Sequence, residues 1–375
     1  MMMKKILYNI AGTYRPAGME RVLTNKANWF ARNGYEVVIV TTDQKGRKPY
    51  FALHPSVRCI DLGIGYEDNN GGSLLNKILH YPVKQLRHRK ALKKVLTTER
   101  PDITVSMFCN DVSFISGIKD GSKKVLEVHF SRFKRLQYGR KGLWGFVDRW
   151  RSDNDVRLAR KFDAFVVLTR EDAGYWDTDN IHYIPNARTF EKVTPAKLEN
   201  RKVITIGRYA YQKGYDLLIK VWAEVHRQCP DWVLDIIGDG EDRDKLQEMV
   251  RFLGLEGSIN LKHSTQDIEK EYLDASIVAL SSRYEGLPMI LLEAQSFGLP
   301  IVSFGCKCGP KDVITDGKDG FIVGEEDIDG MAEKSVTLIR DEGLRKSMGS
   351  AALAASERYS EKAVMQQWVT LFGEI

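Results

Sequence analysis

Short runs of apolar and β-branched residues alternate along the whole chain with longer stretches of helical spacing. Five runs in the first half predict buried strands at residues 6–10, 36–41, 103–107, 124–128 and 164–168. Five more lie in the second half, at residues 203–206, 233–237, 259–262, 277–280 and 300–303. Helical patterns, such as those at 21–32 and 84–97, separate the runs. This alternation predicts an α/β protein of two Rossmann-like, doubly wound domains that face each other across a cleft.

The boundary between the two domains is predicted at the segment Tyr183-Ile184-Pro185-Asn186-Ala187, which precedes a charged stretch. We expect a first domain at residues 1–187 and a second at 188–359. A terminal helix at about 360–375 is expected to pack back on the first domain. The length of 375 residues suits two such domains. Ligands bind at the carboxyl ends of strands in such sheets, so the strand-to-helix loops are the candidate sites.

The composition excludes several classes of protein. Hydrophobic residues make up 43% and charged residues 28%, the profile of a soluble globular protein. No apolar run approaches the roughly 20 residues that cross a bilayer. The five cysteines are scattered and odd in number, which favours reduced thiols and a cytoplasmic protein. Cys306 and Cys308 form the only close pair, and without a second pair or a nearby His they make a poor metal site.

The net charge of +6 conceals an asymmetry between the two halves. Residues 1–190 hold 33 Lys and Arg against 19 Asp and Glu, a net charge of +14. The excess lies in two clusters: Lys84, Arg87, Arg89, Lys90, Lys93 and Lys94, and then Arg132, Lys134, Arg135, Arg140 and Lys141. Beside the second cluster are apolar and aromatic residues: Leu136, Tyr138, Leu143, Trp144 and Phe146. Such runs are either solvated helix faces or a surface for an anionic partner, and membrane headgroups fit as well as nucleic acid.

Three loops at predicted strand ends carry groups that suit a phosphorylated ligand. The loop after the first strand contains Gly18 but no G-x-G-x-x-G, so the dinucleotide fingerprint is absent, and Gly18 either admits a ligand or makes an ordinary turn. Arg208 and Lys213 follow residues 203–206; they suit a diphosphate, or they only decorate the surface. Gly238 and Asp239 follow residues 233–237, where two glycines around one acid allow a tight turn against a flat ring.

The most informative segment follows residues 277–280 and reads Ser281-Ser282-Arg283-Tyr284-Glu285-Gly286-Leu287-Pro288-Met289-Ile290-Leu291-Leu292-Glu293-Ala294. Pro288 suits the first turn of a helix, and Gly286 leaves the backbone open just before it. The free N–H groups of that helix start would form an anion site. Glu285 then lies before the helix and Glu293 more than a turn inside it. A buried Glu293 requires a polar partner, either a ligand or an Arg of the protein.

The pattern from Glu285 to Glu293 (E-G-L-P-M-I-L-L-E-A) resembles the signature of the retaining glycosyltransferases of family 4, which have the GT-B fold. Supporting motifs occur in the family's order: A-G-M-E-R at 17–21, I-P-N-A at 184–187, G-R-Y-A-Y-Q-K-G at 207–214, I-G-D-G at 237–240, G-P-K-D-V-I at 309–314 and D-G-K-D-G-F-I-V at 316–323. The similarity is strong at 200–325 and thin at 40–125. Ala17 and Asp312 depart from the family, where Gly and Glu are usual.

The resemblance implies a nucleotide-sugar donor and assigns roles to particular residues. Arg208 and Lys213 would bind the donor diphosphate, and Gly18 would complete the donor site from the facing domain. Glu285 would bind the transferred sugar, while Glu293, with the Gly238–Asp239 turn, would bind the nucleoside. Backbone N–H groups would hold the distal phosphate or sugar across a segment of four residues: Gly286, Leu287, Pro288 and Met289. His129, at the end of the strand predicted at 124–128, matches the family's active-site His, although a lone His can also be structural.

The resemblance further implies retention at the anomeric carbon without a protein nucleophile, a metal or a cofactor. The fixed cations and the helix start would stabilise charge on the leaving diphosphate. Three Asp-x-Asp triplets, at 153–155, 242–244 and 327–329, imitate a metal motif of the other glycosyltransferase fold, and we interpret them as chance. The expected donor is a UDP-hexose or UDP-N-acetylhexosamine. The expected acceptor is a saccharide or lipid-linked saccharide of bacterial surface polysaccharide, at the inner face of the cytoplasmic membrane.

Two alternatives stay open at this point. A nucleotide-sugar epimerase of the same fold would need no acceptor and would release a free epimerised sugar nucleotide. A binding protein could instead use the basic first domain on nucleic acid, with an affinity that collapses as salt rises. Of the two partners, a nucleotide sugar fits the motifs and nucleic acid does not.

Overall fold

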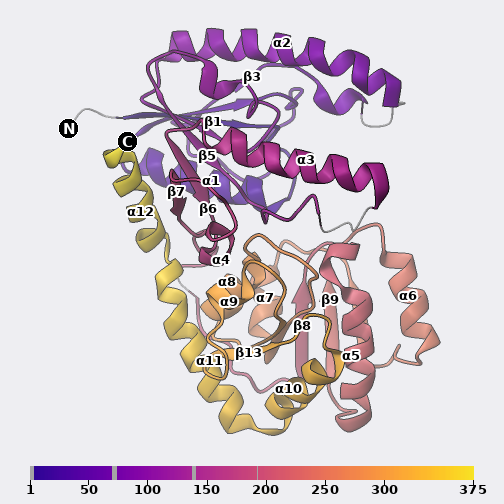
Figure 1. The fold of residues 1–375 in the computed structure, drawn as a ribbon. Helices are drawn as coiled ribbons and strands as arrows, with labels where there is room; N and C mark the ends of the chain where they lie inside the picture. Colours follow the sequence, from indigo (N-terminus) through magenta and orange to yellow (C-terminus); the bar gives the residue numbers. More distant parts are fainter. Residues whose placement is uncertain (1–3, 70–73, 137–140, 192) are drawn as a thin grey trace. The chain divides into compact units, whose positions relative to one another are not determined.

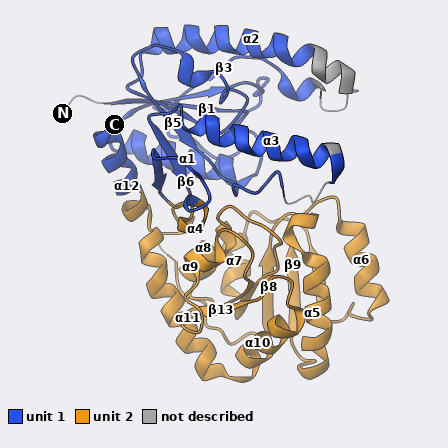
Figure 2. Cartoon of the chain, viewed as in Figure 1, with its two compact units in different colours: residues 1–168, 173–184, 365–375 blue, residues 169–172, 185–364 orange. Residues whose placement is uncertain are grey.

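The computed structural model describes residues 4–69, 74–136, 141–191 and 193–375, without the side chains of 69, 74–79 and 143. Tyr138 and Arg140 of the second basic cluster therefore lie outside the described residues, as does the side chain of Leu143. The chain divides into two compact units (Figure 2). Unit 1 comprises residues 1–168, 173–184 and 365–375, and unit 2 comprises residues 169–172 and 185–364.

Unit 1 is built on a parallel sheet of seven strands in the order β3-β2-β1-β4-β5-β6-β7 (Figure 1). The strands are β1 Lys5–Ile10, β2 Glu36–Thr41, β3 Arg58–Asp61, β4 Ile103–Ser106, β5 Lys123–Glu127, β6 Ala164–Val167 and β7 Ile181–Tyr183. The main helices of this part of the chain are α1 Gly18–Arg32, α2 Leu74–Glu99 and α3 Gly142–Ala159, with 3-10 turns at Tyr66–Asn69 and Ile115–Gly117. The central strands are buried on both faces, as expected for a sheet between helix layers.

Unit 2 has a second parallel sheet, of six strands in the order β10-β9-β8-β11-β12-β13. The strands are β8 Lys202–Ile206, β9 Val233–Ile237, β10 Ile259–Lys262, β11 Ile277–Leu280, β12 Ile301–Phe304 and β13 Gly320–Val323. The helices from the boundary onward are α4 Arg170–Ala173, α5 Tyr215–Gln228, α6 Arg243–Phe252, α7 Ile268–Leu273, α8 Met289–Ser296, α9 Pro310–Val313, α10 Ile328–Arg340, α11 Glu342–Ser356 and α12 Glu361–Glu374, with 3-10 turns at Tyr211–Lys213 and Glu357–Tyr359. Helices α5 and α10 pack on one side of the sheet, and α8 and α11 lie on the other (Figure 1).

The order of the strands identifies where each sheet reverses its winding. The reversal falls between β1 and β4 in unit 1 and between β8 and β11 in unit 2. Loops at the carboxyl ends of the strands beside such a reversal diverge, and they form the usual ligand-binding crevice of open α/β sheets. The candidate loops 207–214 and 281–288 follow β8 and β11, so the topology places them at this position in unit 2.

All ten predicted strands are present, and the structure adds β3, β7 and β13. Two of these strands form the outer edges of the first sheet and the third an edge of the second, and all are short and incompletely buried. β3 and β7 lack the apolar runs that identified the others, whereas β13 contains one, Phe321-Ile322-Val323, that was not predicted as a strand. The helix predicted at 84–97 begins ten residues earlier, at Leu74, because Pro82 lies inside α2 rather than ending it.

The division into units departs from the predicted boundaries by a few residues. Unit 2 begins at Pro185 rather than at 188, and it also takes residues 169–172. Helix α12 begins at Glu361, and its residues from Met365 onward belong to unit 1. There Phe372 stacks on Phe30 of α1 at 5.5 Å between ring centroids.

A buried polar cluster lies at the point where the winding of the first sheet reverses. Asn9 and Ser106 face each other across β1 and β4, and Asp111 follows in the loop after β4. All three are fully buried, and their side-chain oxygen and nitrogen atoms have no hydrogen-bond partner among the described residues. Burial raises the pKa of Asp111 to about 6, although nearby Asn9 and Ser106 partly oppose this. An ionised Asp111 is therefore unfavourable in the folded state.

We predict that Asp111 makes the free energy of unfolding depend on pH. Its folded pKa of about 6 exceeds the roughly 3.9 of an unfolded Asp, so its contribution is favourable at low pH and is lost as pH rises through 6. The shift corresponds to about 3 kcal/mol. Urea unfolding between pH 4 and 7.5 should show this loss in the wild type and not in Asp111→Asn. The exposed control Asp179→Asn should keep the wild-type dependence. A parallel dependence in Asp111→Asn would refute the assignment.

Candidate functional site

Two loops of unit 2 are tied together where the winding of its sheet reverses. Gly214 has φ +63, and a Cβ there would lie 2.1 Å from the carbonyl oxygen of Ser281. Only glycine permits this approach. The Ser281 hydroxyl donates to the carbonyl oxygen of Lys213 at 2.9 Å, and the N–H of Arg283 donates to that of Gln212 at 2.8 Å. The loop 207–214 and the segment that begins at Ser281 therefore form one rigid structure.

Glu285 is the centre of this structure. Its side chain is only 7% exposed, and its Oε1 lies 2.7 Å from the ammonium group of Lys213. The hydroxyl of Ser282 donates to the same oxygen at 2.6 Å, and the amide of Gln212 lies 3.5 Å from Oε2. Hydrogen bonds to a charged partner are shorter and stronger than those between neutral groups. Oε2 is the less engaged oxygen, so it is the one with most capacity left to accept a bond.

Arg208 and Lys213, which the sequence groups together as candidate ligands of a diphosphate, differ in their contacts. Arg208 is exposed, and no described residue forms a hydrogen bond or an ion pair with it. Lys213 is already engaged with Glu285. Arg208 is therefore a free guanidinium, whereas Lys213 neutralises a buried carboxylate and presents the rest of its donors.

Glu293 lies in the middle of α8 and is 8% exposed. Thr189 donates a hydroxyl hydrogen bond to Oε1, and Tyr272 donates one to Oε2, each at 2.7 Å. Tyr272 itself stacks on Phe297 with centroids 5.0 Å apart. The sequence left two options for the partner of Glu293, a ligand or an Arg of the protein. The structure instead places two hydroxyl groups beside its carboxylate. Each carboxylate oxygen can accept more than one hydrogen bond.

The turn Gly238–Asp239 packs against the loop that carries Arg208. A Cβ on Gly238 would lie 2.0 Å from the carbonyl oxygen of Gly207, so the glycine is needed for this contact. Asp239 is half exposed and accepts hydrogen bonds from the N–H and hydroxyl of Ser264 and contacts His263. These bonds hold the pKa of Asp239 well below its usual range. Its carboxylate fixes the loop 263–264 rather than standing free for a ligand.

The start of α8 matches the expected anion site in its backbone. The helix begins at Met289, and Pro288 is its N-cap. No described residue accepts a hydrogen bond from the backbone N–H of Gly286, Leu287 or Met289. Unpaired N–H groups and the positive end of a helix attract anions. Asn186 contacts the sulfur of Met289 at 3.5 Å, which links the start of unit 2 to this helix.

His129 lies in unit 1, two residues beyond β5, and its side chain is 10% exposed. Its Nε2 lies 3.0 Å from Oε1 of Glu127, off the direction of a regular hydrogen bond. The same oxygen accepts a hydrogen bond from Lys26 at 2.5 Å. Burial alone would raise the pKa of Glu127, but the charges of Lys26 and His129 hold it at about 2. The histidine therefore stands beside a permanently ionised carboxylate.

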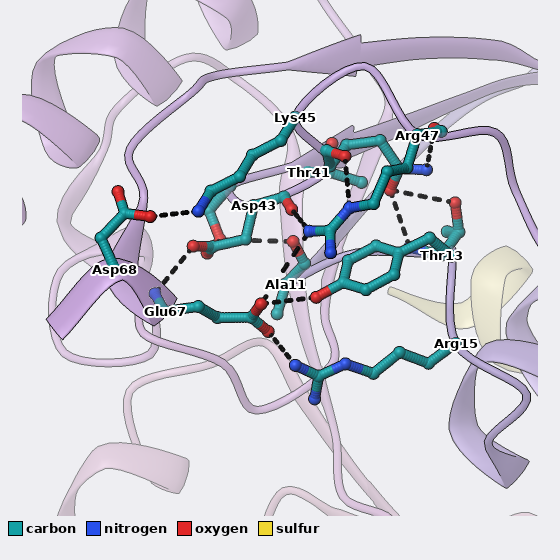
Figure 3. A network of polar contacts seen from close by, with 12 residues as sticks. Ala11, Thr13, Arg15, Thr41, Asp43, Lys45, Arg47, Glu67 and Asp68 are labelled. Carbon is teal, nitrogen blue, oxygen red and sulfur yellow. Dashed lines mark hydrogen bonds and ion pairs between the residues drawn. The ribbon is translucent and has the colours of Figure 1, made fainter. Parts of the chain in front are cut away.

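Gly18 is the first residue of α1, and a Cβ there would meet nothing within 4 Å. The described protein thus gives no packing reason for glycine at this position. The neighbouring loops of unit 1 are joined by a polar network (Figure 3). Tyr14 and Arg15 both reach Glu67 at 2.5 Å, and Lys45 pairs with Asp68. The network fixes the loops after β1, β2 and β3 relative to one another.

Sequence reasoning missed the side chains that support the two glutamates: Thr189, Gln212, Tyr272 and Ser282. Thr189 and Tyr272 are remote from Glu293 in sequence and belong to no motif. Ser282 could have been noticed, because a hydroxyl three residues before an acid is a common local partner. Lys26 was also missed, since it occurs within an ordinary helical pattern.

Two family models cover nearly the whole chain. The model described as "Glycosyltransferase Family 4" matches residues 16–190, and "Glycosyl transferases group 1" matches residues 186–354. An "Uncharacterized glycosyltransferase" of Haemophilus influenzae is 30% identical, over 98% of this chain and 99% of its own length. The Campylobacter jejuni enzyme "GalNAc-alpha-(1->4)-GalNAc-alpha-(1->3)-diNAcBac-PP-undecaprenol alpha-1,4-N-acetyl-D-galactosaminyltransferase" is 25% identical, over 100% of this chain and 99% of its own length.

The fold is shared with solved structures of low sequence identity. A variant of TarM from S. aureus, in complex with fondaparinux, alpha-GlcNAc-glycerol and UDP, matches with a TM-score of 0.78 and 18% identity. The match covers 99% of this chain and 100% of the TarM chain. The likeness therefore extends over both Rossmann-like units and confirms the predicted GT-B fold class.

We predict that the two cations of this site differ in their effect on stability. Lys213→Ala should lower the free energy of unfolding by about 2 kcal/mol, because it leaves the buried Glu285 carboxylate without its counterion. Arg208→Ala should change it by less than about 0.5 kcal/mol, because an exposed side chain without partners stabilises little. Urea unfolding measures both. Adding Glu285→Gln to Lys213→Ala should restore part of the lost free energy of unfolding. Equal effects of Lys213→Ala and Arg208→Ala would contradict this assignment.

Proposed function

Because the chain belongs to the group 1 glycosyltransferases, we propose that it transfers a hexose or N-acetylhexosamine from a UDP-sugar to a saccharide or lipid-linked saccharide. The reaction retains the anomeric configuration and serves the synthesis of bacterial surface polysaccharide. The Campylobacter jejuni relative, whose name describes a lipid-linked saccharide acceptor, and the TarM complex with UDP support this choice.

The observation that carries the proposal is the contact between Lys213 and Glu285. In a nucleotide sugar the anomeric carbon is bonded to the distal phosphate, so the groups that bind the sugar and that phosphate must be neighbours. Glu285 can accept from a sugar hydroxyl through Oε2, and Lys213, 2.7 Å from Oε1, can meet the phosphate. Arg208 supplies the second cation, and the free N–H groups before α8 supply uncharged donors.

Glu293 suits the nucleoside end of the donor. Its carboxylate is held by the hydroxyl groups of Thr189 and Tyr272, and we propose that its oxygens also accept from the hydroxyls of a ribose. In the proposed mechanism the diphosphate leaves on the face that the acceptor enters, and a phosphate oxygen takes the acceptor proton. Arg208, Lys213 and the start of α8 stabilise the charge that develops on the diphosphate. His129 of unit 1 and Gly18 are proposed to contribute to the sugar and phosphate ends.

Fixed protein cations make a metal ion unnecessary in this mechanism. The Asp-x-Asp triplets have structural contacts that account for several of their acids. Asp155 pairs with Arg135, and Asp327 caps the start of α10 by accepting from the N–H of Gly330. No group of three or more candidate metal-binding acids, histidines or cysteines occurs among the described residues.

The surface of unit 1 supports contact with an anionic membrane. Helix α3 exposes aromatic side chains beside Arg149 and Arg151: Trp144, Phe146 and Trp150. Helix α2 exposes the apolar side chains of Val83 and Leu86 among its Lys and Arg residues. Burial raises the pKa of Tyr81 of α2 and Arg151 lowers it, so the two helices present neighbouring groups. No described helix is long and apolar enough to span a bilayer. We propose peripheral binding at the inner face of the cytoplasmic membrane.

The donor assignment is tested with a panel of UDP-, GDP- and TDP-sugars in excess EDTA. A UDP-sugar should raise the melting temperature, and transfer to a lipid-linked acceptor should proceed. Glu285→Gln should keep UDP binding and lose about 10²–10³ in transfer rate, because it removes a charge beside the reacting sugar. Glu342→Gln, which changes an exposed acid paired with Lys346 on α11, is the matched control. Near wild-type turnover of Glu285→Gln would reject its role, and a free epimerised sugar nucleotide without acceptor would favour the epimerase.

The membrane assignment is tested by sedimentation with vesicles. Vesicles that contain anionic lipid should bind the protein, and rising salt should release it, because the attraction combines charge with aromatic insertion. The double change Trp144→Ala and Phe146→Ala should weaken binding. Phe252→Ala is the matched control, since Phe252 is 89% exposed but lies on α6 of unit 2. Equal binding to neutral vesicles would contradict the electrostatic part.

A further inference from the structure

Three buried side chains in unit 1 connect the C-terminal helix to His129. Trp368 of α12 is 1% exposed, and the ammonium group of Lys26 lies 3.8 Å from the centroid of its ring. Lys26, on α1, is 5% exposed and donates to Glu127 at the end of β5. Glu127 in turn lies 3.0 Å from Nε2 of His129. One carboxylate oxygen thus faces both a lysine and the candidate active-site histidine.

A buried lysine among apolar residues is unusual, and its cost must be offset by its contacts. Burial lowers the pKa of Lys26, and the charge of Glu127 opposes that change. The indole face of Trp368 adds a favourable cation–π contact and excludes water from the ammonium group. The pair of Lys26 and Glu127 therefore carries no net charge, although each member is ionised.

Few other charged groups face His129. Glu20 of α1 lies near enough for the histidine to lower the pKa of its carboxyl, which burial raises. Arg15 and Glu67 act on Glu20 from the network of Figure 3. Tyr8 of β1 stands beside Glu127, and its pKa is raised well above the usual value by burial and then by that carboxylate. Among these groups, Lys26 is the cation in direct contact with the carboxylate that faces His129.

We propose that Lys26 is a positioning residue for the transfer reaction: its ammonium group neutralises Glu127, so that this carboxylate can orient the His129 ring without placing net negative charge beside it. The inference rests on the proposed function only in taking His129 as a group that meets the substrate. Glu127 is a positioning residue in the same sense. The C-terminal helix contributes Trp368, whose indole ring covers the ammonium group of Lys26 and excludes water from it.

Loss of Lys26 would change the electrostatic surroundings of Glu127 and His129. Without Lys26 the buried Glu127 would need another counterion, and the imidazolium form of His129 is the nearest one. A charged ring cannot accept a hydrogen bond from a sugar hydroxyl, because both of its nitrogens are then donors. Loss of Lys26 should thus inactivate the enzyme near neutral pH through His129, without removing any group that touches the substrate.

The test follows the histidine ring by NMR in protein labelled on its seven histidines, with His129 assigned from a His129→Asn variant. In Lys26→Met the ring should titrate at least about one pH unit higher than in the wild type. In Glu127→Gln it should titrate lower. The double variant Lys26→Met and Glu127→Gln should return close to the wild type, because the pair that it removes is neutral. Transfer by Lys26→Met should fall at least tenfold at pH 7 and recover as the pH is raised.

Lys124→Met is the matched control for the loss of a buried lysine. Lys124 is 4% exposed on β5 and pairs with Asp120, away from His129. This variant should lose stability yet leave the His129 titration unchanged. If Lys26→Met does not fold, the double variant Lys26→Met and Glu127→Gln still tests the proposal. A His129 titration midpoint that differs from the wild type by about one pH unit in this variant would overturn the neutral-pair assignment. An unchanged midpoint in folded Lys26→Met would mean that Glu127 takes up the proton itself, and the proposal fails.

The titration and the transfer assay separate two possible failures. If no nucleotide sugar supports transfer in the wild type, the proposed function is wrong, and the titration still reports whether Lys26 governs His129. If transfer proceeds but the titrations do not move as described, the function stands and the role of Lys26 is rejected.

Discussion

The ion pair between Lys213 and Glu285 holds the candidate donor site together. It joins the loop after β8 to the loop after β11, at the one place in the second sheet where neighbouring loops diverge. Gly214 makes the contact possible, since any side chain there would collide with the backbone of Ser281. The pair places a carboxylate and a cation within one hydrogen bond of each other at this position. Arg208 and the N–H groups before α8 then extend the cationic side without altering this centre.

Three buried glutamates of the protein show how the partner of a carboxylate decides its role. Glu285 has a lysine and a serine on its Oε1, so Oε2 is the less engaged oxygen. Glu293 accepts hydrogen bonds from two hydroxyl groups, those of Thr189 and Tyr272. Glu127 has Lys26, which cancels its charge, so it can orient His129 without polarising the surroundings. The three carboxylates therefore differ in the kind of partner they have: an ammonium group with a hydroxyl group, two hydroxyl groups, and a buried ammonium group.

The two units differ in what they place at their strand ends. Unit 2 has the Lys213–Glu285 pair at the β8–β11 position, and the backbone N–H groups at the start of α8 could bind an anion. Unit 1 instead has a network of paired charges around Glu67, a buried neutral pair at Lys26 and a buried acid at Asp111. Its excess positive charge lies on the exposed faces of α2 and α3. The division suits a donor held by one unit and an acceptor drawn to a membrane by the other.

The sequence by itself determined the central strands, the two-domain α/β class and the positions of Arg208, Glu285 and Glu293. These follow from apolar runs, from strand-to-helix loops and from the E-x(7)-E spacing, all of which are local in the chain. It did not identify β3 and β7, because these edge strands are not buried on both faces and contain no apolar run; β13 was missed although Phe321, Ile322 and Val323 are apolar. Only the tertiary structure decided that Lys213 pairs with Glu285, while no described residue pairs with Arg208. It also decided that Thr189 and Tyr272 donate hydrogen bonds to Glu293, and that Lys26 donates one to Glu127. Those contacts join residues remote in sequence, so they exist only once the sheets have brought the loops together.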